Sequence, residues 1–332
     1  MQVSRKAYKK PKSLLFQLVK VSILALIFFT LFSQFKSRGI SPESLMRNVS
    51  GLFSDSLHLS WFGIVLILMV VNWGLEALKW QLLTDNIEEM TYASSFKGVL
   101  MGLAAGIFTP LMIGDFWGRA YLFQASNKKK SVGANLFNSF TQTYAAIFFG
   151  AVALVMFVFF YPEKSDAWIM VMAVLLVLAS VGGLFILLKR ASLRSVNKPA
   201  FLKGIINKYF ASIADLSGKD TYNILLLSLL RNLVFGLQFI LVYRMCGLDL
   251  AFIPLFIGVN LIFLVKTVGG GLNVVGDLSL REIVALWFFG MFGVSDSAVA
   301  FATFLIWAIN ILLPVLAGAV LISTLKSPTQ HA

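Results

Sequence analysis

The chain has 332 residues, of which 58% are hydrophobic and 13% are charged, and it contains 31 Phe and 7 Trp. Because a water-soluble domain has about 25% charged residues, this composition excludes an ordinary soluble protein and indicates one embedded in lipid. The formal net charge is +13. Cytoplasmic loops of membrane proteins collect Lys and Arg, so this excess predicts loops facing anionic lipid, and we expect no nucleic-acid partner.

The chain has few residues of the kinds that hold metals or form redox centres. Cys246 is the only cysteine, and His58 and His331 are the only histidines. A single cysteine excludes an intramolecular disulfide and any Cys-based metal or redox motif. Neither histidine lies near another metal-ligand pattern. We therefore expect no metal and no other cofactor.

The N-terminal region predicts a cytoplasmic start followed by a membrane anchor. Residues 1–13 are strongly basic, and the apolar run 14–35 after them has 22 residues. At about 1.5 Å per helical residue, such a run crosses a hydrocarbon core of about 30 Å. A cleaved secretory signal is the alternative, but its apolar region has about 7 to 15 residues and ends at small residues, which this run does not. A retained anchor with a cytoplasmic N-terminus is predicted.

Seven segments are apolar and long enough to cross a membrane. They are residues 14–35, 61–83, 141–161, 167–188, 221–243, 252–266 and 298–325. Two more, 95–116 and 267–292, contain helix-breaking glycine or proline, and irregular backbone survives at membrane depth only inside protein or beside water. We predict an all-α polytopic membrane protein with about seven or eight transmembrane helices and two re-entrant or broken segments. Residues 14–325 form its single transmembrane domain, and 326–332 are a C-terminal tail.

The distribution of charge favours a re-entrant path for residues 95–116. Cytoplasmic loops are enriched in Lys and Arg. If this segment turns back on itself, the lysine run 128–130 lies on the cytoplasmic side together with the basic loop 189–220. A full crossing would place the lysine run outside. For 267–292 both paths stay open, because the C-terminal tail carries little charge.

An amphipathic helix is predicted over about 199–217, within the basic loop. Apolar residues recur there at helical spacing between Lys and Asn residues, and Pro199 and Gly218 suit its two ends. Such a helix lies in the headgroup plane with its cations toward acidic lipid, or it packs on the protein's own cytoplasmic face. The sequence favours neither alternative.

The first candidate site lies on a continuous span. Glu76 and Lys79 are three residues apart in segment 61–83, so a helix places them on one face, where they can pair. An ionised group at mid-membrane costs roughly 2.5 to 3.5 kcal/mol on insertion scales, which predicts that both side chains point into the protein. A purely structural ion pair is the alternative to a substrate site.

The second candidate site follows a predicted helix break. Pro110 and Gly114 interrupt the segment, and exposed backbone dipoles at such a break can meet an anionic group. Asp115 and Arg119 are four residues apart, which suits an ion pair if a helix restarts there. The alternative is that Asp115 caps this helix while Arg119 contacts headgroups at the interface.

The third candidate site surrounds the glycine-rich bend 269–271. The residues expected to contribute there are Lys266, Asn273, Arg281 and Glu282. Cations on both sides of such a bend can receive a phosphate. Asp277 or Ser279 is predicted to cap the following helix. No Gly-Lys-Ser/Thr follows at the required spacing, so the bend is not a Walker loop.

Three short motifs resemble the lysylphosphatidylglycerol synthase transmembrane (flippase-like) family. They are Leu75-Glu76-Ala77-Leu78-Lys79-Trp80, the segment from Pro110 to Arg119 with Gly114-Asp115, and the segment from Gly276 to Glu282. The resemblance covers roughly residues 15–325 and is that of a stand-alone member without the soluble aminoacyltransferase domain. It implies a membrane protein that handles or translocates lipids, with two re-entrant elements near a central cavity.

The chain departs from the family pattern at two positions. Lys79 stands where the family usually has Arg, and Leu111 follows Pro110 where the family often has Gly. An ammonium group lacks the bidentate fork of a guanidinium, which affects the headgroup role that the resemblance implies for Lys79.

These features predict a flippase-like lipid translocase for an anionic phospholipid or a polyprenyl-linked phosphate. The cations expected to meet the headgroup are Lys79, Arg119, Lys266 and Arg281. The carboxylates expected to hold them in place are Glu76, Asp115 and Glu282. The expected location is a bacterial cytoplasmic (inner) membrane, and the sequence is compatible with a homo-oligomer or with a partner membrane protein.

Two other functions stay open. The first is a secondary transporter of a small solute or ion, with Glu76 as proton carrier and the two broken segments as related halves of an inverted repeat. The second is headgroup transfer by an enzyme at the membrane surface. The sequence shows no pair of nucleophile and base, so we expect no enzymatic activity.

Overall fold

The structure is a computed structural model that describes residues 56–107, 109–189, 216–269 and 274–325. Within these ranges the regular secondary structure is helical, and no strand occurs among them. A helix satisfies its backbone donors and acceptors internally, as an apolar environment requires. The predicted all-α fold is confirmed.

Five helical stretches are long and apolar enough to cross a membrane. They are α3 (Ser56–Thr84), α6 (Lys128–Phe160), α7 (Ala167–Leu188), α10 (Gly218–Met245) and the continuous stretch Asp296–Thr324, which contains α13 (Asp296–Trp307) and α14 (Leu313–Thr324). They confirm the predicted segments 61–83, 141–161, 167–188, 221–243 and 298–325. Outside the described residues lie the basic N-terminus 1–13, the anchor 14–35, all but the end of the amphipathic helix 199–217, and the tail 326–332.

The first broken segment is a helical hairpin. Its arms are α4 (Tyr92–Gly106) and α5 (Ile113–Ala120), and the 3-10 turn Pro110–Met112 lies between them. The predicted interruption of 95–116 is therefore observed. The two arms pack against each other along their length.

The bend and the arms of this hairpin depend on unusual backbone geometry. Leu111 and Met112 adopt φ angles of 55° and 53°, in the left-handed region that costs a non-glycine residue about 1–3 kcal/mol. A Cβ placed on Gly118 would lie 2.5 Å from the Cα of Gly102 on the opposite arm. The two backbones are thus nearly in contact, which only glycine permits.

The second broken segment, 267–292, supplies the second arm of a corresponding hairpin. Its arms are α11 (Phe252–Val268) and α12 (Val274–Gly290), and they pack against each other. The predicted span 252–266 is therefore observed as the first arm of a hairpin rather than as an independent crossing. With 17 residues, α11 is shorter than the five long helical stretches.

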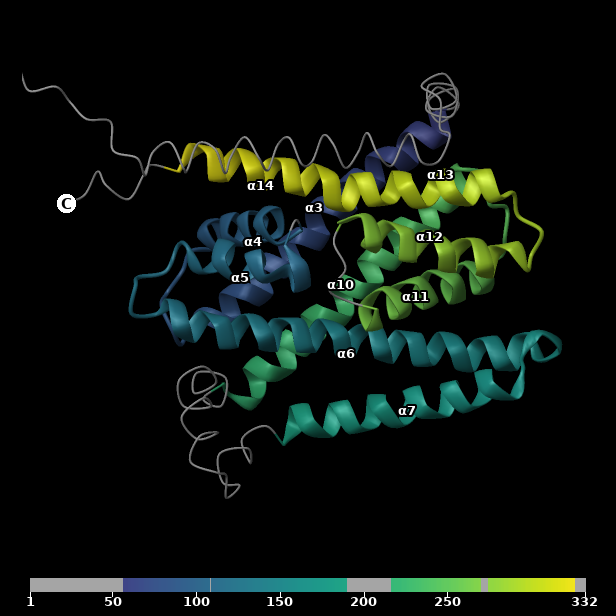
Figure 1. The fold of residues 1–332 in the computed structure, drawn as a ribbon, viewed down its shortest axis with the longest axis horizontal. Helices are drawn as coiled ribbons and strands as arrows, with labels where there is room; N and C mark the ends of the chain where they lie inside the picture. The colour runs from purple at the N-terminus through teal and green to yellow at the C-terminus, as the bar shows by residue number, and fades with distance from the viewer. Residues whose placement is uncertain (1–55, 108, 190–215, 270–273, 326–332) are drawn as a thin grey trace, which may run out of the picture.

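α3 and α10 cross the middle of the molecule beside each other and run antiparallel (Figure 1). Near one end, Gln238 donates to the carbonyl of Val65 at 2.9 Å, and near the other, Lys79 donates to Ser228 at 3.3 Å. One hairpin follows the C-terminal end of α3 and the other follows the C-terminal end of α10. The hairpins therefore enter from opposite ends, and α4 and α11 each run inward from the end at which they begin.

The order of long helix, hairpin and long helix occurs twice, first as α3, α4–α5 and α6, then as α10, α11–α12 and α13–α14. The packing repeats as well, because α4 lies against α14 as α11 lies against α6. This is the arrangement expected of two related halves in opposite orientation. α7 packs on the outside of α6 and exposes most of its apolar side chains, as a lipid-facing helix would.

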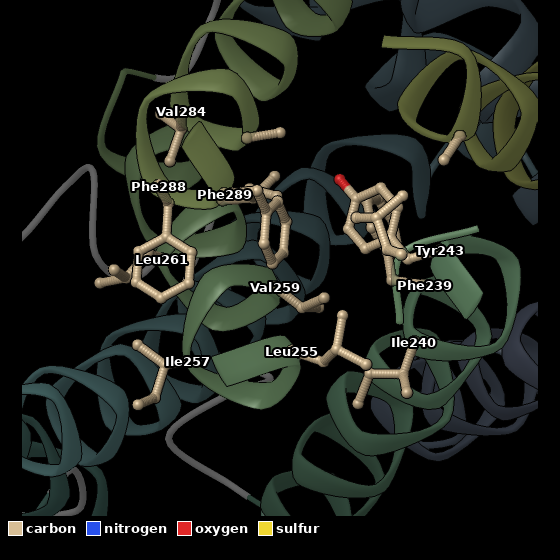
Figure 2. Packing of buried hydrophobic residues seen from close by; sticks show 14 of the residues in the cluster. Phe239, Ile240, Tyr243, Leu255, Ile257, Val259, Leu261, Val284, Phe288 and Phe289 are labelled. Carbon is tan, nitrogen blue, oxygen red and sulfur yellow. The ribbon is translucent and has the colours of Figure 1, made fainter. Parts of the chain in front are cut away.

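A large apolar core holds the second hairpin against α10 (Figure 2). Tyr243 of α10 meets Phe289 of α12 edge to face, with ring centroids 5.0 Å apart. Phe288 of α12 likewise packs against Phe157 of α6. Aromatic pairs of this kind add about 0.5–1.5 kcal/mol each beyond the area that they bury. The core thereby fixes the arm that carries Asp277 and Arg281.

Candidate functional site

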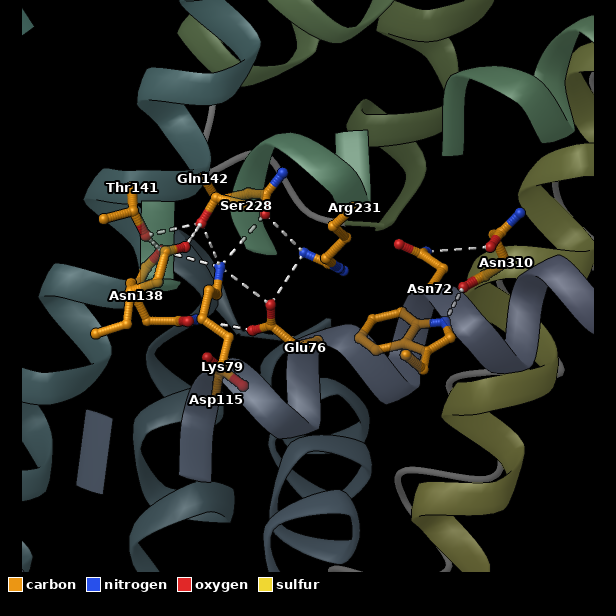
Figure 3. A network of polar contacts seen from close by, with 12 residues as sticks. Asn72, Glu76, Lys79, Asp115, Asn138, Thr141, Gln142, Ser228, Arg231 and Asn310 are labelled. Carbon is orange, nitrogen blue, oxygen red and sulfur yellow. Dashed lines mark hydrogen bonds and ion pairs between the residues drawn. The ribbon is translucent and has the colours of Figure 1, made fainter. Parts of the chain in front are cut away.

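Glu76 of α3 is the centre of a buried ion network (Figure 3). Its Oε1 accepts hydrogen bonds from Arg119 Nη2 at 2.8 Å and from Asn138 Nδ2 at 2.7 Å. Its Oε2 lies 3.2 Å from both Lys79 Nζ and Arg231 Nη1. A carboxylate withdrawn from water costs several kcal/mol unless it is paired. Here three cations and an amide, supplied by four different helices, compensate it.

Lys79 supports this network from the side away from the cavity. Its side chain is fully buried, and Nζ lies 3.3 Å from both Ser228 Oγ and Gln142 Oε1. Besides Glu76, its remaining protein acceptor is the backbone carbonyl of Asn138, at 3.5 Å. Lys79 is not among the described residues that line the cavity. The structure therefore places Lys79 to hold Glu76 and Gln142.

The first hairpin contributes an ion pair at the start of α5. Arg119 Nε donates to Asp115 Oδ1 at 2.9 Å and to Oδ2 at 3.1 Å. Asn135 of α6 donates to the same carboxylate at 2.9 Å, and the Arg119 guanidinium lies 5.0 Å from the ring centroid of Trp80. The predicted pairing of Asp115 with Arg119 is confirmed. These contacts fix the guanidinium in one orientation, with Glu76 as its second carboxylate.

The second hairpin contributes a matching ion pair. Arg281 Nε donates to Asp277 Oδ2 at 2.9 Å, and Lys266 Nζ lies 3.6 Å from Oδ1 of the same aspartate. Arg281 is buried and lies 5.7 Å from the ring centroid of Phe235. The sequence Gly-Asp-x-x-x-Arg occurs at 114–119 and again at 276–281. Each hairpin thus carries the same Asp–Arg pair directly after its bend.

The two pairs face one central cavity of about 420 Å³. The first bend lines it through Leu111 and Met112, as do the C-terminal end of α11 and the middle parts of α3, α6 and α10. Its charged lining consists of Glu76, Asp115, Arg119, Arg231, Lys266, Asp277 and Arg281. A cavity of this size lies in the usual range for small-molecule and cofactor sites.

An irregular stretch between α13 and α14 adds amide groups to the cavity. The π-helical residues Ala308–Leu312 include Asn310, whose backbone carbonyl accepts from Trp73 Nε1 at 3.0 Å. The Asn310 side chain accepts from Asn72 at 3.4 Å, and both asparagines line the cavity. Single π-turns of this kind are frequent at functional sites.

The structure brings together six of the eight predicted site residues. Glu76, Lys79, Asp115 and Arg119 belong to the Glu76 network, and Lys266 and Arg281 belong to the second ion pair. Glu282 follows Arg281 on α12 but is not among the described residues that line the cavity. Asn273 lies outside the described residues.

Two charged residues of the site were not predicted. Arg231 is a cation in the middle of the apolar segment 221–243, and the rule that identified Glu76 would also have found it. Asp277 was expected only as a possible helix cap. That expectation is wrong, because α12 begins at Val274 and the Asp277 carboxylate pairs with Lys266 and Arg281.

Fold and site together define a polytopic helical membrane protein with a buried, charged cavity between two opposed hairpins. A family model described as the lysylphosphatidylglycerol synthase TM region matches residues 17–318. The chain belongs to this family, as its motifs predicted. No curated protein sequence matches the chain.

Proposed function

We propose that this protein is a lipid translocase that binds the headgroup of an anionic phospholipid or lipid-linked phosphate in the central cavity and carries it across the membrane. Family membership relates the chain to membrane proteins that handle lipids. The proposal is carried by one observation, namely that four cations line a cavity deep among membrane-spanning helices. Moving a charged headgroup through hydrocarbon is costly, and a polar cavity lowers that cost without any chemical step.

Charge at the two ends supports an orientation with the N-terminal end of α6 in the cytoplasm. The lysines 128–130 lie at that end, as does Lys219 at the start of α10. The opposite end, where α6 and α10 end and α7 and α13 begin, carries Glu163, Asp166, Asp249 and Asp296 against only Lys164 and Arg244. Because positive charge favours the cytoplasmic side, this asymmetry supports a cytoplasmic-membrane protein whose α14 ends in the cytoplasm.

A secondary transporter of a small solute or ion is the alternative, and the repeated order of helices and opposed hairpins favours it. In that mechanism Glu76 would carry a proton. Three cations and Asn138 surround its carboxylate, an arrangement that stabilises a fixed negative charge rather than a mobile proton. The contacts of Glu76 therefore favour the translocase.

The proposed translocation is tested with Arg231→Gln in proteoliposomes that contain a fluorescent anionic phospholipid. A membrane-impermeant quencher then reports transfer of label from the inner leaflet. Wild-type protein is expected to accelerate transfer, and the variant to slow it at least about tenfold, equivalent to about 1.4 kcal/mol, because one of four lining cations is lost.

Arg244→Gln is the matched control, because Arg244 lies in the last turn of the same helix and is exposed. This variant is expected to transfer lipid at the wild-type rate. Transfer that is no faster with wild-type protein than in protein-free vesicles would rule out the translocase.

A further inference from the structure

Positive charge exceeds negative charge in and around the cavity. The lining cations are Arg119, Arg231, Lys266 and Arg281, and Lys79 adds a fifth behind Glu76. The carboxylates beside them are Glu76, Asp115 and Asp277. Residues 270–273 of the nearby bend are Gly-Gly-Leu-Asn and add no charge. Within this set, two positive charges have no carboxylate to balance them.

An unbalanced charge is costly at a buried site. Arg281 is 1% exposed and Arg119 is 5% exposed, so bulk water screens neither of them well. In such surroundings an uncompensated ion is strongly destabilising, and a bound counter-ion of matching charge relieves the cost. The excess therefore predicts a ligand with two negative charges.

Three arginines also have N–H groups without a partner among the described residues, which indicates a ligand with several acceptor oxygens. Arg119 Nη1, Arg231 Nε and Arg281 Nη1 are buried, and none of them has a hydrogen-bond partner among the described residues. All three side chains line the cavity, from α5, α10 and α12 respectively. At least one other nitrogen of each group pairs with Glu76, Asp115 or Asp277, which orients the guanidinium groups.

We infer that the cavity binds a lipid headgroup with two negative charges on phosphate, that is, a phosphate monoester or a diphosphate, in preference to a phosphodiester with one charge. A terminal phosphate offers three acceptor oxygens, and its two charges match the excess of the site. The inference rests on the proposed function only in assigning the cavity to a lipid headgroup. It specifies which class of lipid that function serves.

The test measures binding without transport. Delipidated protein in detergent is titrated with phosphatidic acid, phosphatidylglycerol and phosphatidylcholine of identical acyl chains, and complexes are counted by native mass spectrometry. Inorganic phosphate is titrated in a separate series. The solution is kept at about pH 8, well above the second pKa of a phosphate monoester, which is about 6. Phosphatidic acid is expected to bind at least about tenfold more tightly than phosphatidylglycerol.

Lys266→Gln is the decisive variant because it removes one charge with little disturbance of the fold. The Lys266 side chain is 36% exposed and its contact with Asp277 is long, at 3.6 Å. With an excess of one charge left, the preference for phosphatidic acid over phosphatidylglycerol is expected to shrink at least about threefold. Lys219→Gln removes the same charge at the exposed start of α10, and the preference is expected to be unchanged.

The outcomes separate this inference from the proposed function. Equal binding of phosphatidic acid and phosphatidylglycerol, or a preference that Lys266→Gln leaves intact, would overturn the inference even if lipid is translocated. Binding of inorganic phosphate as tight as that of phosphatidic acid would also overturn it, because a soluble anion would then suffice. Selective binding of phosphatidic acid that Lys266→Gln weakens would support it even if no lipid crosses the membrane.

Discussion

Replacing Glu76 with glutamine is expected to lower the melting temperature of the purified protein markedly and to abolish lipid transfer. The neutral side chain leaves Lys79, Arg119 and Arg231 close together without the carboxylate that they share. Removing one partner of a buried ion pair costs about 3–5 kcal/mol, because the remaining charge is buried and uncompensated. Thermal unfolding in detergent, followed by tryptophan fluorescence, measures the effect.

Two further variants show whether charge is the cause. Glu163→Gln changes an exposed carboxylate outside the network and is expected to leave the melting temperature unchanged. Adding Lys79→Met to Glu76→Gln removes a cation together with the anion, so part of the lost stability is expected to return. A Glu76→Gln protein that melts like wild type would show that Glu76 does not hold the network together.

Replacing Gly118 with valine is expected to prevent the first hairpin from closing. The added Cβ would lie 2.5 Å from Gly102 Cα and 2.6 Å from Gly102 N. Both are backbone atoms, which cannot rotate away as a flexible side chain can. Overpacking typically costs about 1–3 kcal/mol and occasionally more, and a backbone clash belongs at the upper end. We expect little monodisperse protein on gel filtration, a lower melting temperature and no lipid transfer.

Gly182→Val on α7 is the matched control, because a Cβ at Gly182 meets nothing within 4 Å. It introduces the same side chain at an exposed helical position, so the effect of valine on helix formation is shared while the backbone clash is absent. Gly182→Val is expected to behave like wild type. A Gly118→Val protein of equal yield and melting temperature would mean that the arms of the hairpin need not approach so closely.

Much of the fold can be predicted from hydropathy, because a continuous apolar helix is the simplest way to satisfy backbone groups in lipid. The five long helical stretches follow from this rule, and Glu76 is recognisable as buried because a charge inside such a run must be paired. Pro110 and the glycines mark the first break. Asp115 and Arg119 were paired correctly from their spacing, since that contact is local.

The remaining features depend on contacts between segments far apart in sequence. The length of segment 252–266 is compatible both with a full crossing and with one arm of a hairpin. Only its packing against α12 distinguishes the two. Arg231 meets Glu76 only because α3 and α10 run antiparallel. The contacts of Lys79 with Gln142 and Ser228 likewise require three helices to assemble. These contacts cannot be predicted from any local sequence pattern.

The opposed hairpins have a consequence for the direction of the transport that we propose. Each hairpin carries the same Asp–Arg pair, and the two hairpins enter from opposite ends, so the proposed carrier would present a similar ion pair to a lipid from either side. Net flux then follows the difference in lipid abundance between the leaflets, and a directional process requires that lipid be consumed on one side or that transport be coupled to an ion gradient.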